Sequence, residues 1–284
     1  MLKQRVITAL VLLAILLPAL FYPSFVPFAV VTLVMMAAGA WEWGRLNGLG
    51  HGASLVLGAL CLALCSLSWA AGWLQLALPW LWTLGGAAWV LGGAWLLRVG
   101  VDGWPRVPRA LRIVGGVLAL WLAWLAVAQA RVAGINFLLS VLTLVWAADI
   151  FAYFAGRAFG LRFTKGKLAP SISPGKSWEG VWGGMAGVLA LALAWVWADA
   201  HWQTAVPSLY THLARRGWWL LLIGALFMAA MSVVGDLVES LIKRSAGVKD
   251  SSGLLPGHGG VLDRVDALLP TLPLAMMLTS LTTP

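Results

Sequence analysis

Long apolar runs recur along the whole chain, and each is close to the roughly 20 residues that a helix needs to cross the hydrocarbon core of a bilayer. Backbone N–H and C=O groups find no water in lipid, so a spanning run must form a helix that satisfies them internally. The last run is short and contains Pro270 and Pro273. The nine expected spans cover residues 6–22, 25–43, 53–71, 75–97, 111–130, 135–157, 178–198, 217–241 and 264–281.

The composition indicates the same class of protein, because 61% of the 284 residues are hydrophobic and only 10% are charged. Soluble domains lie far from these values. We therefore predict an all-α integral membrane protein, a polytopic helix bundle of about nine transmembrane helices. Residues 1–130 would form about five of these spans, and residues 131–284 the others. Attraction to anionic lipid headgroups explains the net charge of +9, so we expect a membrane-lipid partner and no nucleic acid.

The positive charges predict how the chain is oriented. If the N-terminus is cytoplasmic, all but three of the 19 Lys and Arg residues lie on the cytoplasmic side, the exceptions being Arg131, Arg215 and Arg216. Short cytoplasmic loops of membrane proteins carry such an excess of cations. We therefore expect a multi-pass protein with its N-terminus in the cytoplasm. The short N-terminus and compact loops favour a bacterial inner membrane.

The ten acidic residues gather on the same side, with Asp199 as the exception. A carboxylate inside the hydrocarbon region costs about 2.5–3.5 kcal/mol on insertion scales, so it is retained where it has a partner, a cation or a wet cavity. We interpret Glu42 and Arg45 as an ordinary interfacial pair. The other acids on this side are Asp102, Asp149, Glu179, Asp236, Glu239, Asp250, Asp263 and Asp266.

Helical spacing places several of these acids on common faces. The eighth span carries polar residues at i, i+3, i+4 and i+7, namely Asp236, Glu239, Ser240 and Lys243. The sixth span carries Asp149 and Tyr153 on one face with Arg157 beside them, and Asp263 and Asp266 would open the ninth. Three helices could thus direct carboxylates into one pocket. The alternatives are structural, since Glu239 and Lys243 have the order of a helix salt bridge and Asp149 could pack against Arg157 or a hydroxyl.

The segment 249–266, KDSSGLLPGHGGVLDRVD, concentrates charge and glycine in an otherwise apolar chain. Glycine permits positive φ, which lets backbone N–H groups approach an anion as they do in phosphate-binding nests. Carboxylate oxygens suit Mg²⁺, which often shares a phosphate ligand with one or two acids. Cations and acids together are what phosphoryl or nucleotidyl transfer requires. The segment supplies Lys249, His258 and Arg264 as donors, and Asp250, Asp263 and Asp266 as acids.

A second polar block, residues 169–180, lies on the same side. It offers hydroxyl groups, Lys176 and exposed amides ahead of a helix N-terminus, where an anion is favoured by the helix dipole. Taken alone, it is equally well read as an ordinary loop with a Ser-Pro-Gly turn and an N-cap at Ser177.

Three motifs carry a resemblance to a known family. SLIKR at 240–244, KD at 249–250 and LPGHGGVLDRVD at 255–266 together resemble the signature of the phosphatidate cytidylyltransferase (CDP-diacylglycerol synthase) family. DIFAYFAGR at 149–157 and SPGKSWEG at 173–180 also resemble family motifs. The resemblance therefore covers the C-terminal half specifically, whereas the first 130 residues match only in hydropathy.

The resemblance implies an enzyme that condenses CTP with phosphatidic acid to give CDP-diacylglycerol and pyrophosphate, with Mg²⁺ and room for a second cation. Residues 131–284 would be its catalytic region, with the site at the cytoplasmic face, and a homodimer is expected. Asp236 and Asp263 would bind the metal, although Asp263 and Asp266 could divide so that one pairs with Arg264 or Lys243. The other implied catalytic residues are Lys243, Arg244, Lys249, Asp250, His258, Arg264 and Asp266. The implied substrate-binding residues are Asp149, Tyr153, Arg157, Ser173, Lys176, Glu179, Ser240, Gly259 and Gly260.

Two other functions fit parts of the pattern. A secondary transporter also has intramembrane carboxylates, but it usually has access from both sides and repeated broken helices, and no repeat is evident here. Another lipid enzyme, a CDP-alcohol phosphotransferase or a polyprenol-type kinase, would share the phosphate chemistry. The motif of the former and a Gly-x-x-x-x-Gly-Lys-Ser/Thr loop are both absent from the sequence.

Overall fold

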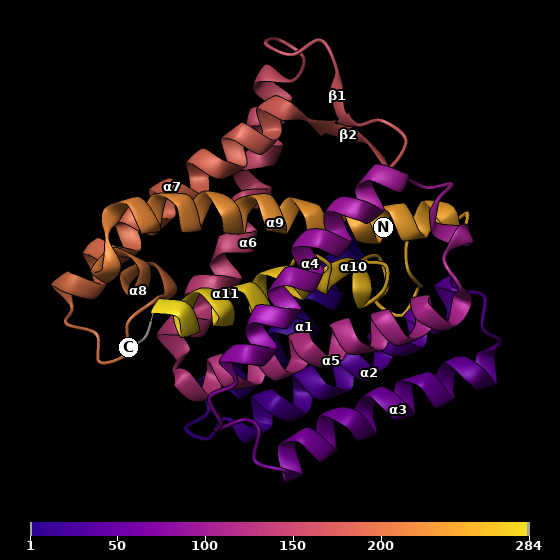
Figure 1. Ribbon diagram of the computed structural model, residues 1–284, viewed down its shortest axis with the longest axis horizontal. Helices are drawn as coiled ribbons and strands as arrows, with labels where there is room; N and C mark the ends of the chain where they lie inside the picture. The colour runs from indigo at the N-terminus through magenta and orange to yellow at the C-terminus, as the bar shows by residue number, and fades with distance from the viewer. Residues whose placement is uncertain (1, 283–284) are drawn as a thin grey trace.

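The computed structural model describes residues 2–282, which form a helical bundle (Figure 1). The first eight predicted spans correspond to eight long apolar helices among these residues, so the fold class is confirmed. Its helices are α1 (Leu2–Phe21), α2 (Val26–Leu46), α3 (His51–Ala70), α4 (Pro79–Val99), the 3₁₀ turn η1 (Trp104–Arg106), α5 (Arg109–Ala133), α6 (Ile135–Phe159), α7 (Trp178–His201), α8 (Leu209–Arg216), α9 (Trp218–Ser245), α10 (Leu262–Val265) and α11 (Leu268–Thr282).

The predicted ninth span is not one long helix. The short helix α10 ends at Val265, the chain turns at Asp266 and Ala267, and α11 then runs for 15 residues. This is shorter than the roughly 20 residues that cross a bilayer. Pro273 inside α11 removes one helical hydrogen bond. Membrane helices tolerate such a proline where neighbouring groups provide a new partner for the freed carbonyl.

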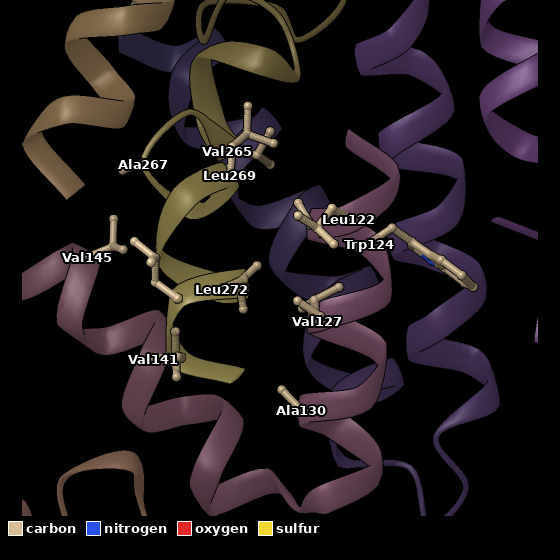
Figure 2. Close-up of a cluster of buried hydrophobic side chains, with 14 of the residues drawn as sticks. Leu122, Trp124, Val127, Ala130, Val141, Val145, Val265, Ala267, Leu269 and Leu272 are labelled. Carbon is tan, nitrogen blue, oxygen red and sulfur yellow. The ribbon is translucent and has the colours of Figure 1, made fainter. Parts of the chain in front are cut away.

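Helix α11 occupies the centre of the bundle. It packs against α4, α5 and α9, and Figure 1 shows it between α9 and the group formed by α2, α3 and α5. Figure 2 shows Leu272 of α11 between Val141 of α6 and Val127 of α5, and all three side chains are buried. Helix association in lipid depends on such close van der Waals packing, because lipid tails are as apolar as the side chains.

Helices α6 and α7 approach each other very closely because glycines of α7 face α6. A Cβ atom at Gly183 would lie 2.1 Å from the Cβ of Ala155, and one at Gly187 would lie 2.3 Å from Cγ of Phe151. Small residues at such an interface are the usual means of close helix packing in membranes. The two helices thereby form one wall of the candidate site.

A small antiparallel hairpin, β1 (Lys167–Ala169) and β2 (Ser173–Ser177), connects α6 to α7. Ser177 accepts a hydrogen bond from the backbone N–H of Gly180 at 3.2 Å, so the predicted N-cap is confirmed. The hairpin, the end of α9 and the glycine-rich segment 249–266 lie at one end of the bundle, here called the site end. The start of α1 is also there, because Arg5 donates a hydrogen bond to Gly257 O at 3.0 Å.

Candidate active site

Lys243, near the end of α9, forms ion pairs with two carboxylates. Its Nζ lies 2.6 Å from Glu239 Oε2 and 2.6 Å from Asp263 Oδ1, and both acidic side chains are only 5% exposed. Buried charges are tolerated when they are paired, and removing one partner leaves the others uncompensated. The predicted pair of Glu239 with Lys243 is therefore confirmed, and the same lysine ties α10 to α9.

Asp263 is also held by the glycine-rich segment. Its Oδ2 accepts hydrogen bonds from Ser251 N at 2.9 Å, Ser251 Oγ at 2.8 Å and Gly260 N at 2.7 Å. Burial alone would raise the pKa of Asp263, but the hydrogen bonds from Lys243, Gly260 and Ser251 outweigh it and hold the pKa below its usual range. Asp263, rather than Asp266, is therefore the aspartate that pairs with Lys243.

Glu42 of α2 is a site residue that sequence reasoning missed. It is completely buried and accepts hydrogen bonds from Ser252 Oγ at 2.6 Å, Val261 N at 2.9 Å and Leu262 N at 2.8 Å. The interpretation as an interfacial pair with Arg45 was wrong, because Arg45 instead lies over the Trp41 ring. The guanidinium carbon is 5.0 Å from the ring centroid. The sequence does contain one signal for this role, because Glu42 lies between two tryptophans inside an apolar span. An acid in such a place needs a buried partner, but the sequence does not identify that partner.

The glycine-rich segment does wrap around anions, but these are the protein's own carboxylates. The N–H groups of Gly260, Val261 and Leu262 donate to Asp263 or Glu42, so they do not form the predicted phosphate cradle. A Cβ atom at Gly260 would lie 2.3 Å from Glu42 Oε1, which explains the need for glycine there. Gly259 has a φ of +80°, a conformation that other residues rarely adopt.

A polar cavity of about 530 Å³ lies between α6, α7, α9 and the hairpin. Lys176 of β2 forms an ion pair with Asp236 of α9, and Ser240 donates a hydrogen bond to Asp236 at 3.2 Å. Asp149 of α6 lies within electrostatic range of Lys176 and Asp236. The structure thus brings together charged residues that were predicted from the sixth span, the eighth span and the polar block 169–180. The predicted residues that line the cavity are Asp149, Tyr153, Arg157, Lys176 and Asp236.

Asp266 lies within electrostatic range of Asp236, Asp149 and Lys243. Among residues 2–282, no three or more His, Cys, Asp or Glu side chains form a group that could hold a metal alone. Mg²⁺ commonly uses one or two carboxylates and takes its remaining ligands from water and substrate phosphates. Asp236 and Asp149 suit that mode, because both line the polar cavity.

Glu179 contacts the loop that follows α6. Its Oε1 accepts hydrogen bonds from Phe163 N at 3.0 Å and from Thr164 N at 2.8 Å. Its Oε2 is buried without a hydrogen-bond partner among residues 2–282.

Ser173 begins β2, at the site end. Tyr153 accepts a hydrogen bond from Arg157 at 3.1 Å, which fixes these two side chains at the cavity wall.

The remaining predicted cations lie at the edge of the site. Arg244 donates to Ile172 O at 3.4 Å, which links α9 to the hairpin loop, and Arg264 donates to His258 O at 3.0 Å. Lys249 and Asp250 are exposed. These side chains are therefore free to meet a ligand from solvent, in contrast to the buried Lys243.

The fold and the site define a polytopic membrane protein in which acids and cations from several helices surround a polar cavity at one end, the chemistry of a phosphate-transfer site. The chain belongs to the cytidylyltransferase family, whose model matches residues 3–282. It is 44% identical to a phosphatidate cytidylyltransferase of Pseudomonas aeruginosa, over 96% of this chain and 95% of the relative. It is 37% identical to a phosphatidate cytidylyltransferase of Haemophilus influenzae, over 96% of each chain. A phosphatidate cytidylyltransferase of Bacillus subtilis is 39% identical over 52% of this chain and 49% of the relative.

Proposed function

We propose that this chain condenses CTP with phosphatidic acid to give CDP-diacylglycerol and pyrophosphate. The observation that carries the proposal is the polar cavity in which Lys176, Asp236 and Asp149 meet beside the ion pairs of Lys243. The names of the relatives from P. aeruginosa and H. influenzae, which match almost the whole chain, support the same reaction.

The proposed reaction is a direct displacement at the α-phosphorus of CTP. An oxygen of the lipid phosphomonoester forms the new bond, and the bond from the α-phosphorus to the bridging oxygen of the β-phosphate breaks. The electron pair of that bond leaves with pyrophosphate. A phosphomonoester is already largely anionic at neutral pH, so no strong general base is required. The protein's task is to position two anions and offset their charge, for which Lys176 and Arg157 line the cavity.

Mg²⁺ belongs to the proposal, and when bound it would neutralise phosphate charge and orient the substrates. Asp236 and Asp263 are the ligands that the sequence predicts. Asp236 borders the cavity, whereas both oxygens of Asp263 already accept hydrogen bonds or an ion pair. We therefore assign Asp263 a second role, which is to hold the glycine-rich segment in place. Asp149 and Asp266 are further candidate ligands, either for the same cation as Asp236 or for a second cation.

We also propose a location and an assembly. The distribution of cations supports a site end in the cytoplasm, where CTP is dissolved and the lipid headgroup is at the surface. The bacterial relatives support a bacterial inner membrane. A homodimer is the proposed assembly. A transporter is not favoured, because the acids gather at one end of the bundle.

Pyrophosphate release by the purified protein in detergent and lipid tests this proposal. CTP, phosphatidic acid and Mg²⁺ are omitted in turn, and the full mixture is repeated with Asp236→Asn. We expect release only with all three, and a loss of roughly 100-fold or more in the variant. Asp102→Asn, which changes an exposed acid outside the cavity, should retain activity. Equal release without phosphatidic acid, or full activity of Asp236→Asn, would overturn the proposal.

A further inference from the structure

A second cavity, of about 530 Å³, opens between α4 and α5 and reaches α9. Its apolar rim includes Leu84 of α4 and Leu118 of α5, whose side chains are exposed on spanning helices. The residues of α9 that line it, among them Gly235 and Val238, do not line the polar cavity around Asp236. Helix α9 therefore separates the two cavities, and the proposed reaction does not use the second one.

The lining of this cavity follows the depth of one bilayer leaflet. Its polar end contains Trp104 of η1 and Arg112, near the start of α5. The ring N–H of Trp43, the neighbour of Glu42, donates to Arg112 O at 3.0 Å, so this polar end lies at the site end. The lining continues along α5 to Leu122, about 15 Å further along the helix axis. One leaflet of the hydrocarbon core is about equally thick, so the cavity has room for an acyl chain next to a headgroup.

Two glycines keep this space open. Gly92 of α4 and Gly115 of α5 both line the cavity, and a Cβ atom built at either position would meet no atom within 4 Å. Close helix packing therefore does not explain these two glycines, in contrast to Gly183 and Gly187 of α7. The space beside Gly92 and Gly115 is available to an apolar chain.

Two hydrogen-bond donors at the polar end have no acceptor in the protein. Trp104 Nε1 and Arg112 Nε are both buried, and neither has a hydrogen-bond partner among residues 2–282. The guanidinium carbon of Arg112 lies 5.7 Å from the centroid of the Trp104 ring, so the two donors are neighbours. A buried donor is costly to leave unsatisfied, and more so when it is charged. An anionic oxygen would satisfy both donors, and arginine suits a phosphate group especially well.

The charges in the lining select among phospholipids. Within residues 2–282, the charged side chains that line the cavity are Arg112 and Glu239, and Glu239 is already paired with Lys243 at 2.6 Å. Arg112 forms no ion pair within the part of the chain that the structure describes. One unpaired cation matches the single negative charge of a phosphodiester. A zwitterionic headgroup would add a second cation beside Arg112, and Glu239 is not free to balance it.

We propose that this cavity binds an anionic phospholipid with a phosphodiester headgroup, the class that phosphatidylglycerol represents. The lipid phosphate lies against Arg112 and Trp104, and one acyl chain lies between α4 and α5. Basic pockets between transmembrane helices bind anionic headgroups in other membrane proteins. The lipid is a bound component of the protein and not the substrate, because α9 stands between it and Asp236. Its binding does not depend on the proposed function.

Photo-crosslinking tests the site. The full-length protein is reconstituted in phosphatidylcholine nanodiscs that contain phosphatidylglycerol with a diazirine in one acyl chain, and the labelled peptides are mapped. We expect labels on α4 and α5 that unmodified phosphatidylglycerol displaces and additional phosphatidylcholine does not. Gly115→Leu fills the cavity, so most of these labels should be lost. The matched control Gly52→Leu, at a site with equal free space outside the cavity, should keep them.

The charge at the site has its own pair of variants. Arg112→Gln should reduce labelling by about tenfold, the loss expected for one charge-assisted hydrogen bond. Arg98→Gln removes an exposed cation near the end of α4 that does not line the cavity, so it should leave the labels unchanged. Labels spread evenly over the lipid-facing helices, or labels unaffected by Gly115→Leu and Arg112→Gln, would overturn the site. Displacement by phosphatidylcholine, or absence of labels because a second copy covers α4 and α5, would overturn it as well.

The unfolding temperature is a second readout of the same site. A lipid that binds the folded protein alone raises this temperature by mass action. Replacing part of the phosphatidylcholine with phosphatidylglycerol should therefore raise it for the wild type and for Arg98→Gln, and much less for Arg112→Gln. An equal rise in all three proteins would indicate a general effect of the bilayer and would contradict the site.

Turnover separates a failure of this site from a failure of the proposed function. Phosphatidylglycerol has no phosphomonoester, so labelling with it does not require the proposed reaction. Asp236→Asn changes the other cavity, so it should abolish turnover and leave the labels on α4 and α5 unchanged. If the wild type is labelled there but does not consume CTP, the function is wrong and the lipid site stands. If it consumes CTP but the labels map elsewhere, the lipid site is wrong and the function stands.

Discussion

Glu42 of α2 accepts a hydrogen bond of 2.6 Å from Ser252 of the glycine-rich segment, although the two residues are 210 positions apart. The same carboxylate accepts hydrogen bonds from the backbone N–H groups of Val261 and Leu262. Helix α2 therefore fixes the segment that also carries Asp263. The first 130 residues contribute directly to the geometry of the candidate site.

Glu42→Gln should destabilise the protein and reduce its activity. The amide keeps the size of the side chain but replaces one acceptor by a donor, so at least one buried N–H or hydroxyl loses its partner. The expected cost is about 1–3 kcal/mol. Thermal unfolding in detergent measures it, with Asp102→Asn as the control for the loss of an exposed acid. An unchanged unfolding temperature would contradict the role assigned to Glu42.

Gly260→Ala should disturb the contact between Glu42 and the glycine-rich segment by changing the segment instead of Glu42. The added Cβ would lie 2.1 Å from Ser251 Oγ and 2.3 Å from Glu42 Oε1, so these side chains must move and their hydrogen bonds weaken. Gly253→Ala is the matched control in the same segment, because a Cβ there meets nothing within 4 Å. Its effect should stay within about 0.5 kcal/mol. Equal thermal stability of the two variants would argue against the tight packing around Gly260.

Lys243→Met and Lys176→Met should differ in their effects on thermal stability and on turnover. Lys243 pairs with two acids that are each 5% exposed, whereas the side chains of Lys176 and Asp236 are 27% and 29% exposed. Breaking a buried pair costs about 3–5 kcal/mol, but a more exposed pair is worth only about 0–1 kcal/mol. Lys243→Met should therefore lower the unfolding temperature clearly. Lys176→Met should leave stability nearly intact while reducing turnover, and a similar loss of stability in both would be inconsistent with this difference.

Because the pKa of Asp263 is lowered in the folded protein, we expect the protein to lose stability in acid. Its pKa is lower in the folded protein than the ordinary value of 3.8, which also describes the unfolded chain. A group with a depressed pKa stabilises the fold above the unfolded pKa, and this contribution is lost as the pH falls through the folded pKa. Unfolding temperatures measured as the pH is lowered from about pH 4 downward should fall more steeply for the wild type than for Asp263→Asn. Parallel curves would show that Asp263 contributes nothing to the acid response.

The sequence predicted the eight long spans and the residues of the polar cavity for physical reasons that act locally. Apolar runs of sufficient length must be helices in lipid, and a spacing of i, i+3 and i+4 puts Asp236 and Ser240 on one face. The break after Val265 was not predicted, because hydropathy continues across Asp266 and cannot show that α11 is buried by other helices rather than by lipid.

The partners of Glu42 could not be found in the same way. Their contact joins α2 to a segment more than 200 positions away, and no local pattern specifies such a pairing. The acceptors of the Gly260, Val261 and Leu262 N–H groups were missed for a related reason. Glycines that favour anion binding were recognised, but the anion is the buried carboxylate of Glu42 or Asp263, which only the packing of α2 and α10 against the segment supplies.

The destination of the α-phosphate of CTP distinguishes nucleotidyl transfer from the other reactions that this site could perform. The purified protein is incubated with phosphatidic acid, Mg²⁺ and CTP radiolabelled at either the α- or the γ-phosphate, and the lipid is extracted. A cytidylyltransferase would move the α-label into the lipid and release the γ-label as pyrophosphate, and Asp236→Asn would prevent both. A γ-label in the lipid would indicate a kinase instead. An extract without either label, from folded protein, would contradict the proposed reaction.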